Sequence, residues 1–215
     1  MDSLLGTVGI NEKRFFGVEF PASNEDLFFV EKYLAPVKGD NIYSILGSGD
    51  VPFLCLDKGA SVYAVDHNFH QIEYVQNRIQ ALRNGNKKFF LSLGDGIDSR
   101  EKYVCNKLSS VNVKNNLKTL EIVAGDLFVP KIGLENFNKV YVSNALGHVN
   151  FRGENIDDQM YDYLEKFIGK FEEGTLFYLT FCGGYGPQGA NSNSRLDFRW
   201  LDTDEMFSHW MFKKK

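Results

Sequence analysis

Short apolar runs alternate with segments of helical periodicity along most of the sequence. Five runs of buried character predict strands: Ile42–Leu46, Val62–Val65, Leu120–Ala124, Lys139–Ser143 and Thr175–Phe181. Helices are predicted over residues 23–36, around 52–56, from Asn68 to Leu82 and over 157–171, and Leu196–Leu201 and Met206–Phe212 predict two closing antiparallel strands. Strands that alternate with helices indicate an α/β fold with a doubly wound, mostly parallel sheet.

The stretch from Asn41 to Leu82 has the most specific order of elements. Its first strand is followed by the turn Gly47-Ser48-Gly49, a helix that stops at Gly59, and a second strand that ends in Asp66. Strand, glycine turn, helix, strand and acid form the order of a nucleotide-binding βαβ unit, which makes the predicted sheet Rossmann-like. Glycines allow a ligand to approach the backbone closely, and a carboxylate at the second strand end can accept both hydroxyls of a ribose.

The residues after the turn bear on which nucleotide binds. A dinucleotide needs its pyrophosphate on open amides at the helix start, where this sequence has Asp50 and Pro52. Asp50 brings negative charge and Pro52 removes an amide donor, so both disfavour a nicotinamide oxidoreductase. S-adenosyl-L-methionine has a ribose, a cationic ammonium and a cationic sulfonium, and it suits this turn better.

The sequence of residues 41–82 resembles that of a known protein family. The turn GSG, four further residues, Leu54 and then AVDHNFHQ (Ala64–Gln71) resemble the cofactor-binding half of class I S-adenosylmethionine-dependent methyltransferases. Within that superfamily the Asp-x-Asn-x-x-Gln after the second strand is similar to that of aminocarboxypropyl transferases related to betaine-lipid synthase. The resemblance covers roughly the first two-thirds of the chain. The sequence departs from the common methyltransferase pattern at Ile45, in place of an acid, and at Val51, in place of a third glycine.

Polar residues that follow Asp66 have two interpretations. Asn68 can cap the next helix, and Gln71 can reach back to it as in a capping box. The resemblance instead implies that both contact the cofactor, and the two interpretations remain open. His67 and His70 flank the same turn and could touch a ligand, but neither has a partner spaced to bind metal, so no metal site is predicted.

Later strand ends add further candidate residues. In the resembling families an acid after the third strand binds the adenine amino group, which implies this role for Asp126 with Leu127 beside the ring; a turn aspartate is the alternative. Ser143 and Asn144 follow the fourth strand, resemble the Ser-Asn of the aminocarboxypropyl transferases, and suit an amino-acid moiety. His148 is placed where a general base would act, although a structural role is also open.

Two segments are candidates for the acceptor site. The third strand comes late in the sequence, so the region around 87–116 is predicted to be an insertion. The sequence does not determine the role of residues 87–118. A glycine-rich polar loop over 183–195 leaves the carboxyl end of the fifth strand and is a candidate lid, with Tyr185, Asn191 and Arg195 as possible contacts.

Composition limits the remaining possibilities. A chain of 215 residues with 43% hydrophobic content can bury one core, which predicts a single domain over 1–215. A net charge of -4 disfavours a general nucleic-acid surface, and no apolar run reaches the roughly 18 residues of a membrane helix. Three scattered cysteines and the absence of a secretory pattern favour a cytoplasmic protein, while the oligomeric state stays open.

These observations predict an S-adenosylmethionine-dependent transferase. Methyl transfer to a small-molecule or peptidic nucleophile is the leading expectation. Aminocarboxypropyl transfer, which releases methylthioadenosine, is the first alternative, and a non-catalytic nucleoside-binding protein is the second. Attack on a sulfonium needs little acid–base chemistry, because the leaving group is already cationic and alignment supplies most of the rate.

Overall fold

A seven-stranded sheet forms the centre of the structure, with the strand order β3-β2-β1-β4-β5-β7-β6. The computed structural model describes residues 26–86, 90, 108–143, 145, 156–182, 196–203 and 207–214. The strands are β1 (Asn41–Ile45), β2 (Ser61–Asp66), β3 (Leu120–Ala124), β4 (Lys139–Ser143), β5 (Leu176–Cys182), β6 (Leu196–Thr203) and β7 (Phe207–Lys214).

Strand direction follows the prediction. β1 pairs in parallel with β2 and β4, β2 with β3, and β4 with β5, whereas β7 runs antiparallel to both β5 and β6. The predicted fold class, a single α/β domain with a doubly wound and mostly parallel sheet, is therefore confirmed. The two closing antiparallel strands were also predicted correctly, and each extends a few residues further than its apolar run.

Helices precede or connect these strands. They are α1 (Leu27–Leu34), α2 (Asp50–Asp57), α3 (Phe69–Arg83), α6 (Ser110–Asn116), the short 3₁₀ helix η1 (Leu117–Thr119) and α7 (Ile156–Ile168). Helix α2 begins two residues before the predicted Pro52, because the Phe53 amide already donates to the Gly49 carbonyl at 2.9 Å. Proline is tolerated there, since amides in a first turn have no intrahelical acceptor. None of the helices in the described ranges is both long and apolar enough to cross a membrane.

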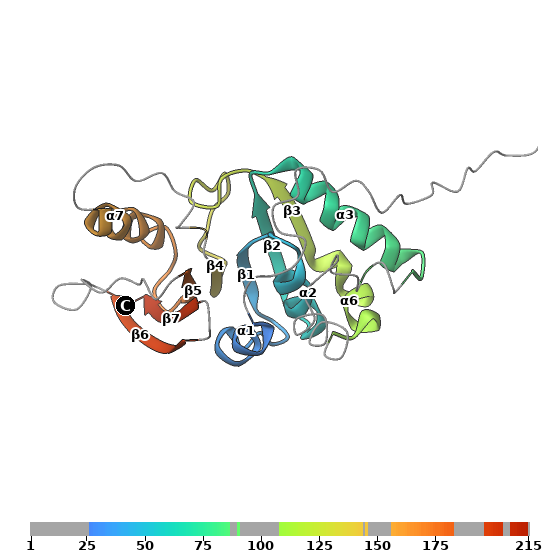
Figure 1. Cartoon of the computed structure of the whole chain (residues 1–215), viewed down its shortest axis with the longest axis horizontal. Coiled ribbons are helices and arrows are strands. Elements are labelled where there is room, and N and C mark those ends of the chain that lie inside the picture. Colours follow the sequence, from blue (N-terminus) through green and yellow to red (C-terminus); the bar gives the residue numbers. More distant parts are fainter. Residues whose placement is uncertain are drawn as a thin grey trace, which may run out of the picture.

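Alternate residues of the strands point to opposite faces and build two cores. Ile42 and Ala64 face a core that includes the buried residues of α1, α2 and α3, whereas Tyr43 and Val65 face a second core with α7. Figure 1 shows α2, α3 and α6 beside β1–β3, and α7 toward the β4–β7 end of the molecule. The helices on the two faces leave the carboxyl ends of the parallel strands gathered at one edge.

Part of the predicted insertion is a helix. Val113 of α6 is buried in the first core, and the Asn116 side-chain amide donates to the Leu56 carbonyl at 2.8 Å. Helix α6 therefore packs on α2 just before the chain enters β3. Residues 87–89 and 91–107 of the insertion region lie outside the described residues, so the acceptor role stays a prediction.

Candidate functional site

The carboxylate of Asp66 joins the two halves of the predicted nucleotide unit. Its Oδ2 accepts from the Gly47 amide at 3.1 Å and its Oδ1 from the Asn68 amide at 2.9 Å. Asp66 ends β2, and Gly47 follows β1 by two residues, so parallel pairing of these strands brings them to the same edge. The side chain is only 5% exposed. Asp66 therefore lies where it was predicted, at the glycine turn.

Asn68 and Gln71 have separate structural roles. The Asn68 Oδ1 caps α3 by accepting from the amides of His70 and Gln71, which agrees with the first of its two interpretations, and its contact with the cofactor remains a prediction. The capping-box prediction for Gln71 is wrong, because its Nε2 donates to the Gly47 carbonyl at 2.7 Å and the Asn68 amide is bound by Asp66 instead. Gln71 thus ties α3 to the glycine turn.

The two glycines of the turn meet different surroundings. Gly47 has a φ of +50°, and no heavy atom of the described residues lies within 4 Å of a Cβ built on it. Gly49 has a φ of +88°, and the same construction brings its Cβ to 3.0 Å from Val75 Cγ1 and 3.1 Å from Phe53 Cε2. Gly49 is therefore needed for close packing against α3. Among the described residues, none but its chain neighbours lies within 4 Å of a Cβ built on Gly47, which is what the approach of a ligand would require.

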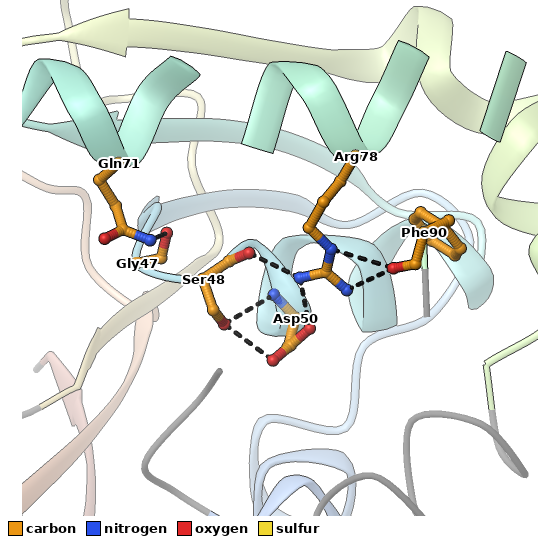
Figure 2. A network of polar contacts seen from close by, with 6 residues as sticks. All are labelled: Gly47, Ser48, Asp50, Gln71, Arg78 and Phe90. Carbon is orange, nitrogen blue, oxygen red and sulfur yellow. Dashed lines mark hydrogen bonds and ion pairs between the residues drawn. The ribbon is translucent and has the colours of Figure 1, made fainter. Parts of the chain in front are cut away.

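A buried ion pair lies directly behind this turn. Arg78 of α3 is 0% exposed, and its Nη1 donates to Asp50 Oδ1 at 2.8 Å and to the Ser48 carbonyl at 2.7 Å (Figure 2). The other Asp50 oxygen, Oδ2, accepts from the Ser48 hydroxyl at 2.8 Å. The prediction that Asp50 brings negative charge to the ligand site is therefore wrong, because its carboxylate is buried and paired with Arg78 inside the protein.

The loop after β3 is held by a buried tyrosine. The Tyr43 hydroxyl donates to the Leu127 carbonyl at 2.8 Å, and burial, with smaller contributions from Tyr63 and Asp126, raises the pKa of Tyr43. Leu127 is buried, whereas Asp126 is exposed and its Oδ1 accepts from the Phe128 amide at 2.8 Å. Asp126 therefore makes the turn contact that was the alternative to adenine binding. Its predicted adenine contact remains a prediction.

The fourth strand ends in an unusual backbone conformation. Ser143 has a φ of +55°, which is uncommon for a residue with a side chain, and the β4–β5 register shifts between Tyr141 and Ser143. Backbone strain of this kind is frequent at functional sites. The predicted residues Asn144 and His148 lie outside the described residues.

The histidines after β2 lie at the surface. His67 and His70 are exposed, as is Phe69, whose side chain is 68% exposed and whose ring meets that of His70 edge to face at 6.3 Å. Among the described residues, no three His, Cys, Asp or Glu side chains are grouped so that they could hold a metal ion. The described site is thus built from amides, carboxylates and glycines.

Two residues of this site were missed in the sequence. Arg78 lies three residues after Val75 and one before Ile79, so it interrupts the apolar face of its helix. A charged residue at such a position indicates a buried partner, and this signal was available. Tyr43 stands inside a buried strand, where a hydroxyl needs an acceptor, but nothing in the sequence indicates that the acceptor is Leu127.

Comparisons with known proteins bear on the fold. No protein-family model matches this sequence, and no curated protein matches it. Among solved structures, an S-adenosylmethionine-dependent methyltransferase from Aquifex aeolicus is similar over 88% of this chain and 90% of its own, with a TM-score of 0.55 and 10% identity. A precorrin-6y C5,15-methyltransferase from Geobacter metallireducens is similar over 94% of this chain and 99% of its own, with a TM-score of 0.53 and 10% identity.

This chain has the fold of class I S-adenosylmethionine-dependent methyltransferases. A TehB-like S-adenosylmethionine-dependent methyltransferase from Corynebacterium glutamicum agrees with this, at a TM-score of 0.50 and 13% identity over 92% of this chain and 89% of its own. These likenesses establish the fold alone. None of the three structures is described as an aminocarboxypropyl transferase, so the local resemblance to relatives of betaine-lipid synthase remains unsupported by them.

Proposed function

We propose that this protein is an S-adenosylmethionine-dependent methyltransferase that acts on a small-molecule or peptidic nucleophile. One observation carries the proposal: in a sheet with the strand order β3-β2-β1-β4-β5-β7-β6, the acid that ends β2 is bonded to the glycine turn that follows β1. This is the place in an open α/β sheet where nucleotide ligands bind.

The residues present fit the ribose of the cofactor. The backbone amides of Gly47 and Asn68 each donate to one oxygen of Asp66, and a carboxylate oxygen can accept more than one hydrogen bond. In the proposal Asp66 accepts the ribose hydroxyls with the carboxylate that also binds these two amides. Apart from its chain neighbours, no described residue lies within 4 Å of a Cβ built on Gly47, which supports an approach of the ligand from this edge.

The same turn does not suit a dinucleotide. Three amides of the turn and the helix start are already used within the chain: Gly47 donates to Asp66, Gly49 donates to the Leu46 carbonyl at 2.9 Å, and Asp50 donates to the Ser48 hydroxyl at 3.2 Å. Pro52 has no amide to offer. A pyrophosphate needs several free amides at this position, so a nicotinamide oxidoreductase stays disfavoured, now for lack of donors rather than for the charge of Asp50.

The proposed reaction asks little of the protein beyond alignment. The bound cofactor supplies an electrophilic methyl group on a cationic sulfur, and the chain holds the ribose at Asp66 and keeps the turn fixed. In the proposal Ser143 and Asn144 contact the amino-acid part of the cofactor, Asn144 also helps to align the acceptor, and His148 takes a proton from it where the nucleophile carries one.

Two alternatives differ from this proposal in their products. Aminocarboxypropyl transfer would release methylthioadenosine instead of S-adenosylhomocysteine, and a nucleoside-binding protein would release neither. The first alternative rests on the resemblance of the Asp-x-Asn-x-x-Gln motif, in which Asp66 and Gln71 bond to Gly47 and Asn68 caps α3.

The test combines binding with product analysis. Calorimetric titrations with S-adenosylmethionine, S-adenosylhomocysteine, methylthioadenosine and NADH come first, followed by mass spectrometry of the nucleosides formed with a panel of acceptors. The proposal expects binding of S-adenosylmethionine and release of S-adenosylhomocysteine. Tight binding of NADH, or binding of none of the adenosyl ligands, would overturn it.

A matched pair of variants tests the role of Asp66. We expect Asp66→Ala to weaken S-adenosylmethionine binding by about 1.5–3 kcal/mol, the range for hydrogen bonds to a charged group. Asp57→Ala is the control, because Asp57 also has a buried carboxylate that accepts a backbone amide, from Ser109 at 3.2 Å, but it lies at the carboxyl end of α2. Equal loss of affinity in both folded variants would remove Asp66 from the site.

A further inference from the structure

The guanidinium of Arg78 is committed to backbone and carboxylate acceptors on two sides. On one side Nη1 reaches the Ser48 carbonyl and Asp50, and on the other Nε and Nη2 reach the Phe90 carbonyl at 3.0 and 2.8 Å (Figure 2). Its Cζ also lies 5.0 Å from the ring centroid of Phe53, 5.7 Å from that of Tyr74 and 5.5 Å from that of Phe90. Four of its five N–H donors are bonded inside the protein and the residue is 0% exposed, so Arg78 acts on the site through its neighbours.

A buried ion pair adds little net stability to a folded protein. Removing two charges from water costs about as much as their attraction returns, and apolar replacements are often as stable. What an arginine adds is direction, because its planar fork fixes the positions of several acceptors at once. Here the acceptors are the Ser48 carbonyl and the Asp50 carboxylate, which flank Gly49.

Three residues of α3 hold the three residues of the turn. Gln71 binds the carbonyl of Gly47, Val75 lies against Gly49, and Arg78 binds the carbonyl of Ser48. They are spaced by four and three residues, so they lie on one face of the helix over two turns. Two of the three turn carbonyls thus depend on polar side chains from the same helix face.

We propose that Arg78 is a positioning residue of the cofactor site, which sets the conformation of the turn at Ser48–Asp50 without touching the ligand. The expected effect of Arg78 on S-adenosylmethionine affinity rests on the proposed function. The expected effect of Arg78 on the conformation of the turn does not depend on any ligand.

Four variants separate positioning from stability. Arg78→Met removes the fork and leaves Asp50 without its counter-ion, and Arg78→Lys keeps the charge but loses the planar geometry. The double variant Asp50→Asn with Arg78→Met removes both charges, which avoids an unpaired buried carboxylate if Arg78→Met alone does not fold. Leu82→Ala is the control, because it is a buried apolar truncation on the same helix beyond Arg78.

The first measurement is amide hydrogen exchange at Gly49 and Asp50 without ligand, compared with amides in the core of β1. In Arg78→Met and the double variant we expect exchange at the turn to rise about tenfold or more relative to the core, the effect of losing a hydrogen bond to a charged group. Leu82→Ala should change both regions together. If the exchange rates at the turn change only as much as those in the core of β1, in both Arg78→Met and the double variant, the proposal is overturned.

The second measurement is S-adenosylmethionine affinity by calorimetry under conditions where each variant is folded. We expect Kd to rise about tenfold or more in Arg78→Met and in the double variant, to rise less in Arg78→Lys, and to stay within about twofold in Leu82→Ala. Wild-type affinity in the double variant, or an equal loss in Leu82→Ala, would overturn the proposal. A wild-type chain that binds no S-adenosylmethionine refutes the proposed function instead, and the exchange measurement still decides the role of Arg78.

Discussion

Alanine at Gly47 and at Gly49 should lower both stability and ligand affinity, but the two variants should rank in opposite order for the two quantities. At Gly47 the φ of +50° falls in the left-handed region, and no described atom lies near the new methyl group. The expected cost is therefore backbone strain alone, about 1–2 kcal/mol of unfolding free energy. At Gly49 the φ is +88° and the methyl group meets Val75 and Phe53 at 3.0–3.1 Å. Overpacking of this kind adds about 1–3 kcal/mol, which brings the total to about 2–5 kcal/mol.

Binding should show the reverse order. The methyl group of Gly47→Ala would enter the space beside the turn that no described residue fills and that the proposed ligand would occupy, so we expect S-adenosylmethionine affinity to fall about tenfold or more. Urea unfolding at 25 °C gives the free energies, and calorimetric titration gives the affinities. Gly49→Ala should lose stability first, and at low temperature its folded fraction should bind more tightly than Gly47→Ala.

Two results would refute this reasoning about the glycines. Unfolding free energies that are equal for the two variants would show that the contacts with Val75 are relieved without cost. Wild-type affinity in Gly47→Ala would show that the open space beside Gly47 is not where the ligand lies.

Three further predictions concern residues that support the sheet. Tyr43→Phe leaves the Leu127 carbonyl without its donor and should cost about 1–3 kcal/mol in urea unfolding, without removing the aromatic packing. Burial raises the pKa of the Cys55 thiol, so iodoacetamide should modify Cys55 only after denaturation, as peptide mass spectrometry would show; rapid labelling of the native protein would contradict its burial. At Asp40, burial acts to raise the pKa, but hydrogen bonds led by that from Lys139 outweigh it and lower the pKa below 3.8. The ionised Asp40 therefore stabilises the protein above pH 3.8, and this stabilisation is lost as the pH falls through the lower folded-state pKa. In urea unfolding measured at several pH values, Asp40→Asn should reduce the loss of unfolding free energy at acid pH. An unchanged pH dependence would contradict the assignment.

Much of the fold was accessible from the sequence because buried parallel strands read as apolar runs. Ile42–Leu46 and Val62–Val65 are packed on both faces, so nearly every position is apolar and the runs stand out. The place of Asp66 at the end of β2 was also predicted, because an acid directly after such a run is a local signal. The start of α2 was misplaced by two residues, since its first turn depends on the Ser48 hydroxyl and the Gly49 carbonyl rather than on any apolar period.

The wrong inference about Asp50 shows where local reasoning fails. From neighbouring residues alone, Asp50 is an acid at a helix start, which predicts that its charge faces the ligand. Its partner Arg78 is 28 positions away in the sequence, and only the packing of α3 against α2 brings the two together. The interrupted apolar face of α3 indicated that Arg78 has a buried partner, but the identity of that partner required the tertiary structure.

The arrangement around the turn also limits how a ligand can approach it. Gly49 is closed off by Val75, and Ser48 is held by Arg78 from the side of α3, so the inner side of the turn is filled by protein. Gly47 is bonded to Asp66, and no described residue other than its chain neighbours lies within 4 Å of a Cβ built on it. Substitutions at Gln71, Val75 and Arg78 should therefore change the conformation of the turn, and affinity only as a consequence. Substitutions at Gly47 and Asp66 should change affinity directly, because in the proposed function these two residues form the edge of the turn that the ligand reaches.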